Sequence, residues 1–99
     1  MRSMFIVAAA WAVLPQPVLA DDVTARSIAA TCAACHGTTG HSVTQTVGAL
    51  AGRQKDDIVD LMRAFKTGKK PSTIMQQIAK GYTDEQIDLV AGYFAAQNK

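Results

Sequence analysis

The pentapeptide Cys32-Ala33-Ala34-Cys35-His36 decides the fold of this 99-residue chain. Two thiols three positions apart lie on one helical turn, where each can add to a vinyl group of the same porphyrin. The histidine directly after the second thiol then lies under the porphyrin iron and can bind it. The spacing therefore predicts one covalently attached haem c, held by Cys32 and Cys35, with His36 as the proximal iron ligand.

The same cysteines have two less favoured interpretations. A thioredoxin-type redox pair needs a strand before the motif, whereas here a helix pattern precedes it. A zinc site made of Cys32, Cys35, His36 and His41 would place four ligands within ten residues, two of them adjacent. That arrangement is poor geometry for a tetrahedral metal site.

The first 20 residues have the pattern of a secretory signal peptide. Arg2 precedes an apolar stretch, Phe5–Leu14, that is too short to cross a bilayer. Two prolines and small residues follow, so we expect cleavage after Ala20 and one mature domain, residues 21–99. An uncleaved N-terminal anchor is the alternative. Because covalent haem attachment takes place outside the bacterial cytoplasm, we expect a periplasmic protein with no stable membrane insertion after cleavage.

Apolar residues recur at helical spacing in three segments of the mature chain. They are Ala25, Ile28, Ala29 and Cys32; Ile58, Leu61, Met62 and Phe65; and Ile87, Val90, Ala91, Phe94 and Ala95. No segment alternates between apolar and polar residues over a useful length, so we expect no sheet. The pattern predicts an all-α domain of three main helices plus a short helix around one covalent haem.

Helix-end signals define the connections. We expect Asp21 and Asp22 to precede the first helix, and residues 36–52 to form a loop over one haem edge. Gly68 is suited to end the middle helix, and Ser72 to cap a short helix running toward Lys80. The run Thr83-Asp84-Glu85-Gln86 predicts a capping box before the last helix.

An electron-transfer haem needs a second iron ligand from the opposite face, and the mature chain offers His41, Met62 and Met75. His41 is too close in sequence to His36 to reach that face, and Met62 lies on an apolar helix stripe where methionine is usually core filler. Elimination favours Met75, and Met62, His41 or an open sixth position are the alternatives. A filled sixth position argues for an electron carrier, not an enzyme such as a peroxidase.

The formal net charge of the whole chain is +2, with no basic tract, so we expect no nucleic-acid partner. Four lysines either steer an acidic partner to the haem edge or are simply solvated. They are Lys66, Lys69, Lys70 and Lys80. We expect Tyr82 and Tyr93 to be core aromatics whose hydroxyls reach the surface or a haem propionate.

The haem motif, the run Leu50-Ala51-Gly52 and the pair Tyr93-Phe94 resemble the class I cytochrome c family. Within that family, the segment 73–84 and the run Phe65-Lys66-Thr67-Gly68 are similar to the cytochrome subunits of flavocytochrome c sulfide dehydrogenases. The resemblance covers essentially all of residues 22–97.

This resemblance implies a class I cytochrome c fold, with Cys32 and Cys35 as attachment points and His36 and Met75 as iron ligands. It further implies an electron-transfer subunit that accepts electrons from a sulfide-oxidising flavoprotein carrying FAD. A free-standing periplasmic cytochrome that carries single electrons between redox enzymes is the alternative. The family usually has a proline at the position of Gly48, and its carbonyl there binds the proximal histidine, so the acceptor in this chain is open.

Overall fold

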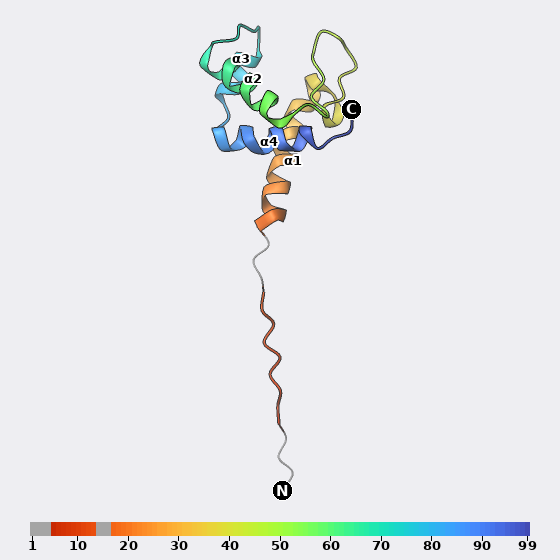
Figure 1. The fold of residues 1–99 in the computed structure, drawn as a ribbon, viewed down its shortest axis with the longest axis vertical. Helices are drawn as coiled ribbons and strands as arrows, with labels where there is room; N and C mark the ends of the chain where they lie inside the picture. Colours follow the sequence, from red (N-terminus) through yellow and green to blue (C-terminus); the bar gives the residue numbers. More distant parts are fainter. Residues whose placement is uncertain (1–4, 14–16) are drawn as a thin grey trace.

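The chain folds into a bundle of helices in the computed structural model, which describes residues 5–13 and 17–99 (Figure 1). In chain order the elements are α1 (Pro17–His36), a 3-10 turn η1 (Thr38–Gly40), α2 (Lys55–Thr67), α3 (Met75–Lys80) and α4 (Asp84–Ala95). The described residues contain no strand. The predicted all-α fold of three longer helices and a short one is therefore confirmed.

The core lies where α4 packs against both α1 and α2, while α3 packs on α2. Residues from all three predicted apolar stripes meet there, and Ile87 and Ala91 of α4 have no exposed surface. The buried cluster consists of Ala29, Ile58, Val59, Ile87, Val90, Ala91 and Phe94. The helical periodicity therefore identified the buried residues described in α1 and α4, but on α2 it identified Ile58 and missed Val59, which is also buried.

Two of the predicted helix ends are confirmed. Gly68 adopts the left-handed conformation, with φ of 80°, and ends α2, because a residue without a Cβ tolerates that backbone. At the start of α4, the Thr83 side chain accepts a hydrogen bond from the Gln86 backbone N–H, and the Gln86 side chain accepts one from Thr83. This is the predicted capping box.

Two other predicted helix starts are wrong. The first helix begins at Pro17, before Asp21, because the fixed φ of proline suits the first helical position. The N-cap of α3 is Ile74, not Ser72. Ser72 still satisfies this end of the helix, because its hydroxyl accepts a hydrogen bond from the Gln76 N–H at 2.8 Å.

The segment 5–13 extends away from the helical domain and has no helix or strand (Figure 1). Its apolar side chains are almost fully exposed, including Phe5 at 91% and Trp11 at 90%. Arg2 and Leu14, at the ends of the predicted signal pattern, lie outside the described residues. None of the described helices combines the length and the apolar character needed to cross a membrane.

Candidate haem site

The C-terminal end of α1 carries the three residues of the predicted haem motif. Cys32 is half-buried and Cys35 exposed, and both are free thiols. The helix ends directly after His36, because Gly37 takes a φ of 84° and donates a hydrogen bond to the Ala33 carbonyl at 3.0 Å. The abrupt end keeps both thiols and the imidazole within the last two turns of one rigid element.

Burial raises the pKa of the Cys32 thiol above its usual value, a contact with the Thr31 hydroxyl partly opposes this rise, and neighbouring Cys35 adds to it. Cys32 is therefore protonated at neutral pH. Because the thiolate is the form that attacks a disulfide or an oxidant, protonation makes Cys32 slow to oxidise.

The imidazole of His36 is oriented by the loop that follows it. Its Nδ1 lies 2.7 Å from the carbonyl oxygen of Gly48. A carbonyl oxygen only accepts hydrogen bonds, so Nδ1 carries the proton and Nε2 keeps its lone pair. A fixed tautomer with a free Nε2 is the form that binds a metal, and the hydrogen bond raises its basicity. Gly48 is therefore the acceptor that the sequence left open.

The base of this loop is held by backbone hydrogen bonds. The N–H groups of Leu50 and Ala51 both donate to the Gly40 carbonyl, at 2.9 and 3.1 Å, and Gly52 donates to the Phe94 carbonyl of α4 at 2.9 Å. These bonds tie both ends of the segment 40–52 together. They place the Gly48 carbonyl within reach of His36 although the loop has no regular structure.

His41 takes no part in the motif. Its Nδ1 lies 2.8 Å from the Thr39 hydroxyl, and its Nε2 is hydrogen-bonded to the backbone carbonyl of Asn98. The ring joins the loop to the C-terminal residues of the chain. Since both nitrogens have these partners, the structure does not favour His41 as an iron or zinc ligand.

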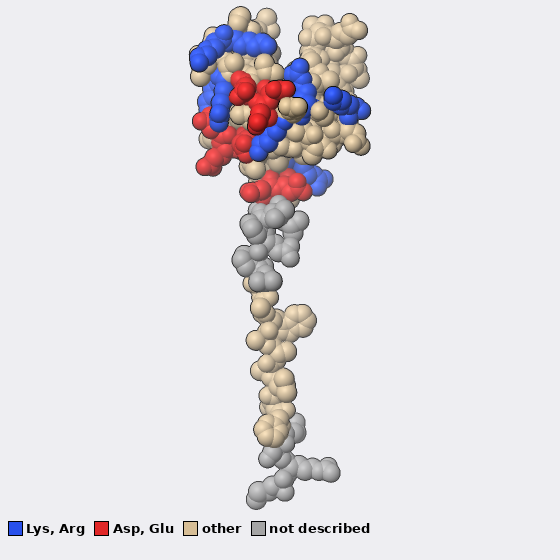
Figure 2. Space-filling model, in the orientation of Figure 1, with Lys and Arg blue, Asp and Glu red and all other residues tan. Residues whose placement is uncertain are grey.

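A notch open on one side separates two lobes of the domain (Figure 2). One lobe consists of α2, α3 and the chain between them, and the other is the loop that follows His36 (Figure 1). Each lobe exposes an apolar side chain, Ile74 at 56% on the first and Val43 at 95% on the second. We call them the α2–α3 lobe and the loop lobe.

The two methionine candidates both belong to the α2–α3 lobe. Met75 is the first residue of α3 and is half-buried. Met62 is half-buried on α2 and packs against the hydrophobic core, as expected for a core methionine. The structure therefore places Cys32, Cys35 and His36 together at the C-terminal end of α1, directly before the loop lobe, and Met75 on the α2–α3 lobe.

A surface hollow of about 600 Å³ is lined by α1, η1 and Tyr93 of α4, and Ala33 of the haem motif is one of its lining residues. Arg26, Ala30 and Thr39 contribute to its lining, and it contains none of the predicted site residues. The candidate haem site therefore stays at the C-terminal end of α1, because the free thiols and the oriented imidazole are the groups with haem-binding chemistry.

The lysines proposed from the sequence as docking groups differ in their surroundings. Lys66 donates a hydrogen bond to the Tyr82 carbonyl at 2.7 Å and lies 3.5 Å from a carboxylate oxygen of Asp84. The ammonium of Lys70 lies 5.6 Å from the centre of the Phe65 ring. The other two lysines are exposed. Lys66 is therefore a structural residue, a role that the sequence did not reveal.

Comparison with known proteins agrees with this geometry. No family model matches the chain. Over 70 residues the chain is 30% identical to cytochrome c-554(548) of Halomonas halodenitrificans, a match that covers 68% of this chain and 84% of that protein. The chain belongs to the class I cytochrome c family. Membership of this family makes it a haem protein that transfers electrons.

Two further relatives extend this result. The cytochrome subunit of sulfide dehydrogenase of Chlorobaculum tepidum is 41% identical over 68 residues, which are 69% of this chain and 61% of that protein. Cytochrome c4 of Pseudomonas aeruginosa is 31% identical over 77 residues, which are 78% of this chain and 38% of that protein. The chain thus spans less than two thirds of the length of either of these relatives.

Proposed function

We propose that this chain is a periplasmic cytochrome subunit with one covalent haem c, which accepts electrons from the FAD-containing flavoprotein of a sulfide dehydrogenase. The observation that carries the proposal is the 41% identity to a cytochrome subunit of sulfide dehydrogenase. The haem motif at the end of α1, with its oriented imidazole, supplies the chemistry that this role requires.

The donor set at the C-terminal end of α1 fits a haem. Cys32 and Cys35 would hold it covalently, each thiol adding across one vinyl group so that the sulfur bonds to one carbon and the proton goes to the other. His36 offers the lone pair of Nε2 to the iron, because its Nδ1 proton is bound to the Gly48 carbonyl. When bound, the haem supplies a reversible one-electron change at its iron.

Met75 is the proposed second iron ligand. It lies on the α2–α3 lobe, opposite the lobe that orients His36. Ligation by histidine and methionine raises the reduction potential of a haem, which suits an acceptor of electrons from a flavin. It also fills the position that substrates such as peroxide would need, so we propose no catalytic activity for this chain itself.

The loop lobe supports a lasting complex with a partner protein. Residues 37–52 include no Lys, Arg, Asp or Glu, and Figure 2 shows this lobe as an uncharged projection. Val43 at its surface is 95% exposed. Depletion of charged residues is typical of the centre of a protein–protein interface. We propose that the flavoprotein covers this lobe.

We propose further that residues 1–20 are a signal peptide removed on export. The exposure of every large apolar side chain in the segment 5–13 supports this, because the helical domain makes no use of them in its core. Removal after Ala20 would shorten α1 at its N-terminal end and leave the haem motif untouched.

Size-exclusion chromatography of the native-host periplasm tests the proposal. We expect the haem absorbance of this polypeptide to elute with a flavoprotein of several times its mass, and sulfide to bleach the flavin and reduce the haem. Elution alone, near the 10.5 kDa mass of the whole chain and without flavin, would contradict the subunit role.

A matched pair of variants tests the proposed interface. Val43→Lys adds a charge to the loop lobe, whereas Gln77→Lys adds one at an exposed position of α3. We expect the first to release the haem protein from the flavoprotein and the second to leave the complex intact. If both variants stay bound to the flavoprotein, or both are released from it, the loop lobe is not the interface.

A free-standing electron carrier is the second candidate. It is favoured by the match to cytochrome c-554(548), of which the chain covers 84%. The same chromatography distinguishes the two roles, because a carrier elutes as a monomer and exchanges electrons with several redox proteins.

A further inference from the structure

The short helix α3 depends on neighbouring elements for its position. It has only six residues, Met75–Lys80, and an isolated helix of that length is not stable in water. One end is held by the Ser72 hydroxyl. The other end leads through Gly81 into Tyr82, whose N–H donates to the Ala79 carbonyl at 3.3 Å. The contacts of Tyr82 therefore fix the C-terminal end of α3.

The hydroxyl of Tyr82 reaches across to α1. It lies 2.8 Å from the hydroxyl of Thr31, the residue directly before Cys32. The Thr31 hydroxyl has a single proton and donates it to the Ile28 carbonyl at 2.7 Å. Tyr82 must therefore be the donor in the pair. Its side chain connects the turn of α1 that carries the first thiol to the segment that follows α3.

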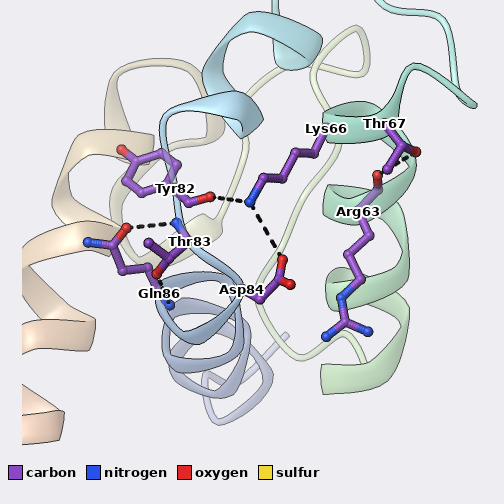
Figure 3. A network of polar contacts seen from close by, with 7 residues as sticks. All are labelled: Arg63, Lys66, Thr67, Tyr82, Thr83, Asp84 and Gln86. Atoms are coloured by element: carbon purple, nitrogen blue, oxygen red, sulfur yellow. Dashed lines mark hydrogen bonds and ion pairs between the residues drawn. The ribbon is translucent and has the colours of Figure 1, made fainter.

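The backbone carbonyl of Tyr82 points the other way, toward α2 (Figure 3). It accepts a hydrogen bond from the Lys66 ammonium at 2.7 Å, and Asp84 of α4 lies 3.5 Å from the same ammonium. The Lys66 side chain is 30% exposed. Charge-assisted hydrogen bonds are among the stronger ones, so Tyr82 is held from both sides.

We propose that Tyr82 is a positioning residue that keeps Met75 on the iron, by tying α3 to the thiol-bearing helix α1 and to α2. The inference rests on the proposed ligation by Met75. The hydroxyl of Tyr82 does not need to touch the haem for this role. Its hydrogen bond limits the movement of α3 relative to α1. It therefore favours the conformation in which Met75 binds the iron.

Imidazole binding to the ferric holoprotein measures this directly, because imidazole must displace Met75 to bind the iron. Tyr82→Phe removes only the hydroxyl and keeps the ring that packs against the core. We expect an increase of about three- to tenfold in imidazole affinity, the usual effect of one lost hydrogen bond. Tyr93→Phe is the matched control, and we expect it to leave the affinity unchanged. An unchanged affinity in Tyr82→Phe would overturn the inference.

Thr31→Val removes the same bond from the other side and remains informative if Tyr82→Phe does not yield holoprotein. We expect the same increase from it, and no further increase in the double variant, because both changes break one bond. Additive effects of the two changes would contradict a shared bond.

A third comparison separates this inference from the proposed ligation. In a Met75→Ala background the iron position is open, so we expect Tyr82→Phe to have no effect on imidazole affinity there. A persisting effect would mean that Tyr82 only loosens the haem pocket. If Met75→Ala alone leaves the affinity of the wild type unchanged, the ligand assignment itself is wrong.

Discussion

The two lobes that flank the notch would position the two proposed iron ligands in different ways. On the loop lobe, a carbonyl at 2.7 Å orients His36, which is the neighbour of Cys35 in sequence. The loop itself is closed by backbone hydrogen bonds to Gly40. On the α2–α3 lobe, Met75 begins a six-residue helix that is held by side chains from other elements. One ligand is fixed locally and the other by tertiary contacts.

This difference predicts that substitutions on the two lobes affect haem binding in different ways. Loss of His36 removes the imidazole at the end of the motif, and the other histidine, His41, has both ring nitrogens hydrogen-bonded to Thr39 and Asn98. Loss of a tertiary contact on the other lobe loosens a ligand without removing it. Substitutions on the loop lobe should therefore affect whether haem is held, and those on the α2–α3 lobe should affect how firmly the sixth position is closed.

The largest effect is expected from His36→Ala. The iron loses its proximal ligand, so stable low-spin holoprotein should not accumulate. The absorbance spectrum of the purified, haem-stained polypeptide measures this outcome. His41→Ala is the control, because His41 binds Thr39 and Asn98 and should leave the spectrum unchanged. A normal low-spin spectrum in His36→Ala would refute the proximal assignment.

Met75→Ala should leave haem attached but open the sixth position. We expect the reduction potential to fall by about 0.1 V or more, because the axial ligand is a main determinant of haem potential. Cyanide should then bind readily to the ferric iron. Met62→Ala keeps the ligand and removes core packing, so it should lower thermal stability with little change in potential. If Met62→Ala lowers the reduction potential and Met75→Ala does not, Met62 is the iron ligand.

The same contrast explains what the sequence could predict. Cys32, Cys35 and His36 lie within five residues, and their chemistry follows from spacing on one helix. The capping box at Thr83 is also local. Tyr82 and Thr31, in contrast, are 51 positions apart, and no periodicity in the sequence indicates that their hydroxyls meet. The helix start at Pro17 was not predicted, because the acidic pair Asp21 and Asp22 is itself a typical helix N-terminal signal.

A glycine pair in the loop lobe gives the next largest effect. Gly37 has a φ of 84°, and a Cβ there would collide with the His41 carbonyl, whereas a Cβ on Gly48 would meet no atom within 4 Å. We expect Gly37→Ala to lower the free energy of unfolding by about 2 kcal/mol or more, and Gly48→Ala to change it by less than about 1 kcal/mol. Thermal unfolding of the holoproteins measures both. Equal losses of stability in the two variants would show that a Cβ at position 37 is tolerated as well as one at position 48.

The smallest effects are expected from the loss of two hydroxyl groups that cap helices, those of Ser72 and Thr83. Ser72→Ala and Thr83→Ala each remove one hydroxyl that accepts a backbone N–H bond at a helix start. Each loss should lower the free energy of unfolding by about 1 kcal/mol. Only Ser72 supports the helix that begins with Met75, so only Ser72→Ala should also raise imidazole affinity, by about two- to fivefold. If both variants raise it equally, the α2–α3 lobe responds to overall stability and not to the anchors of α3.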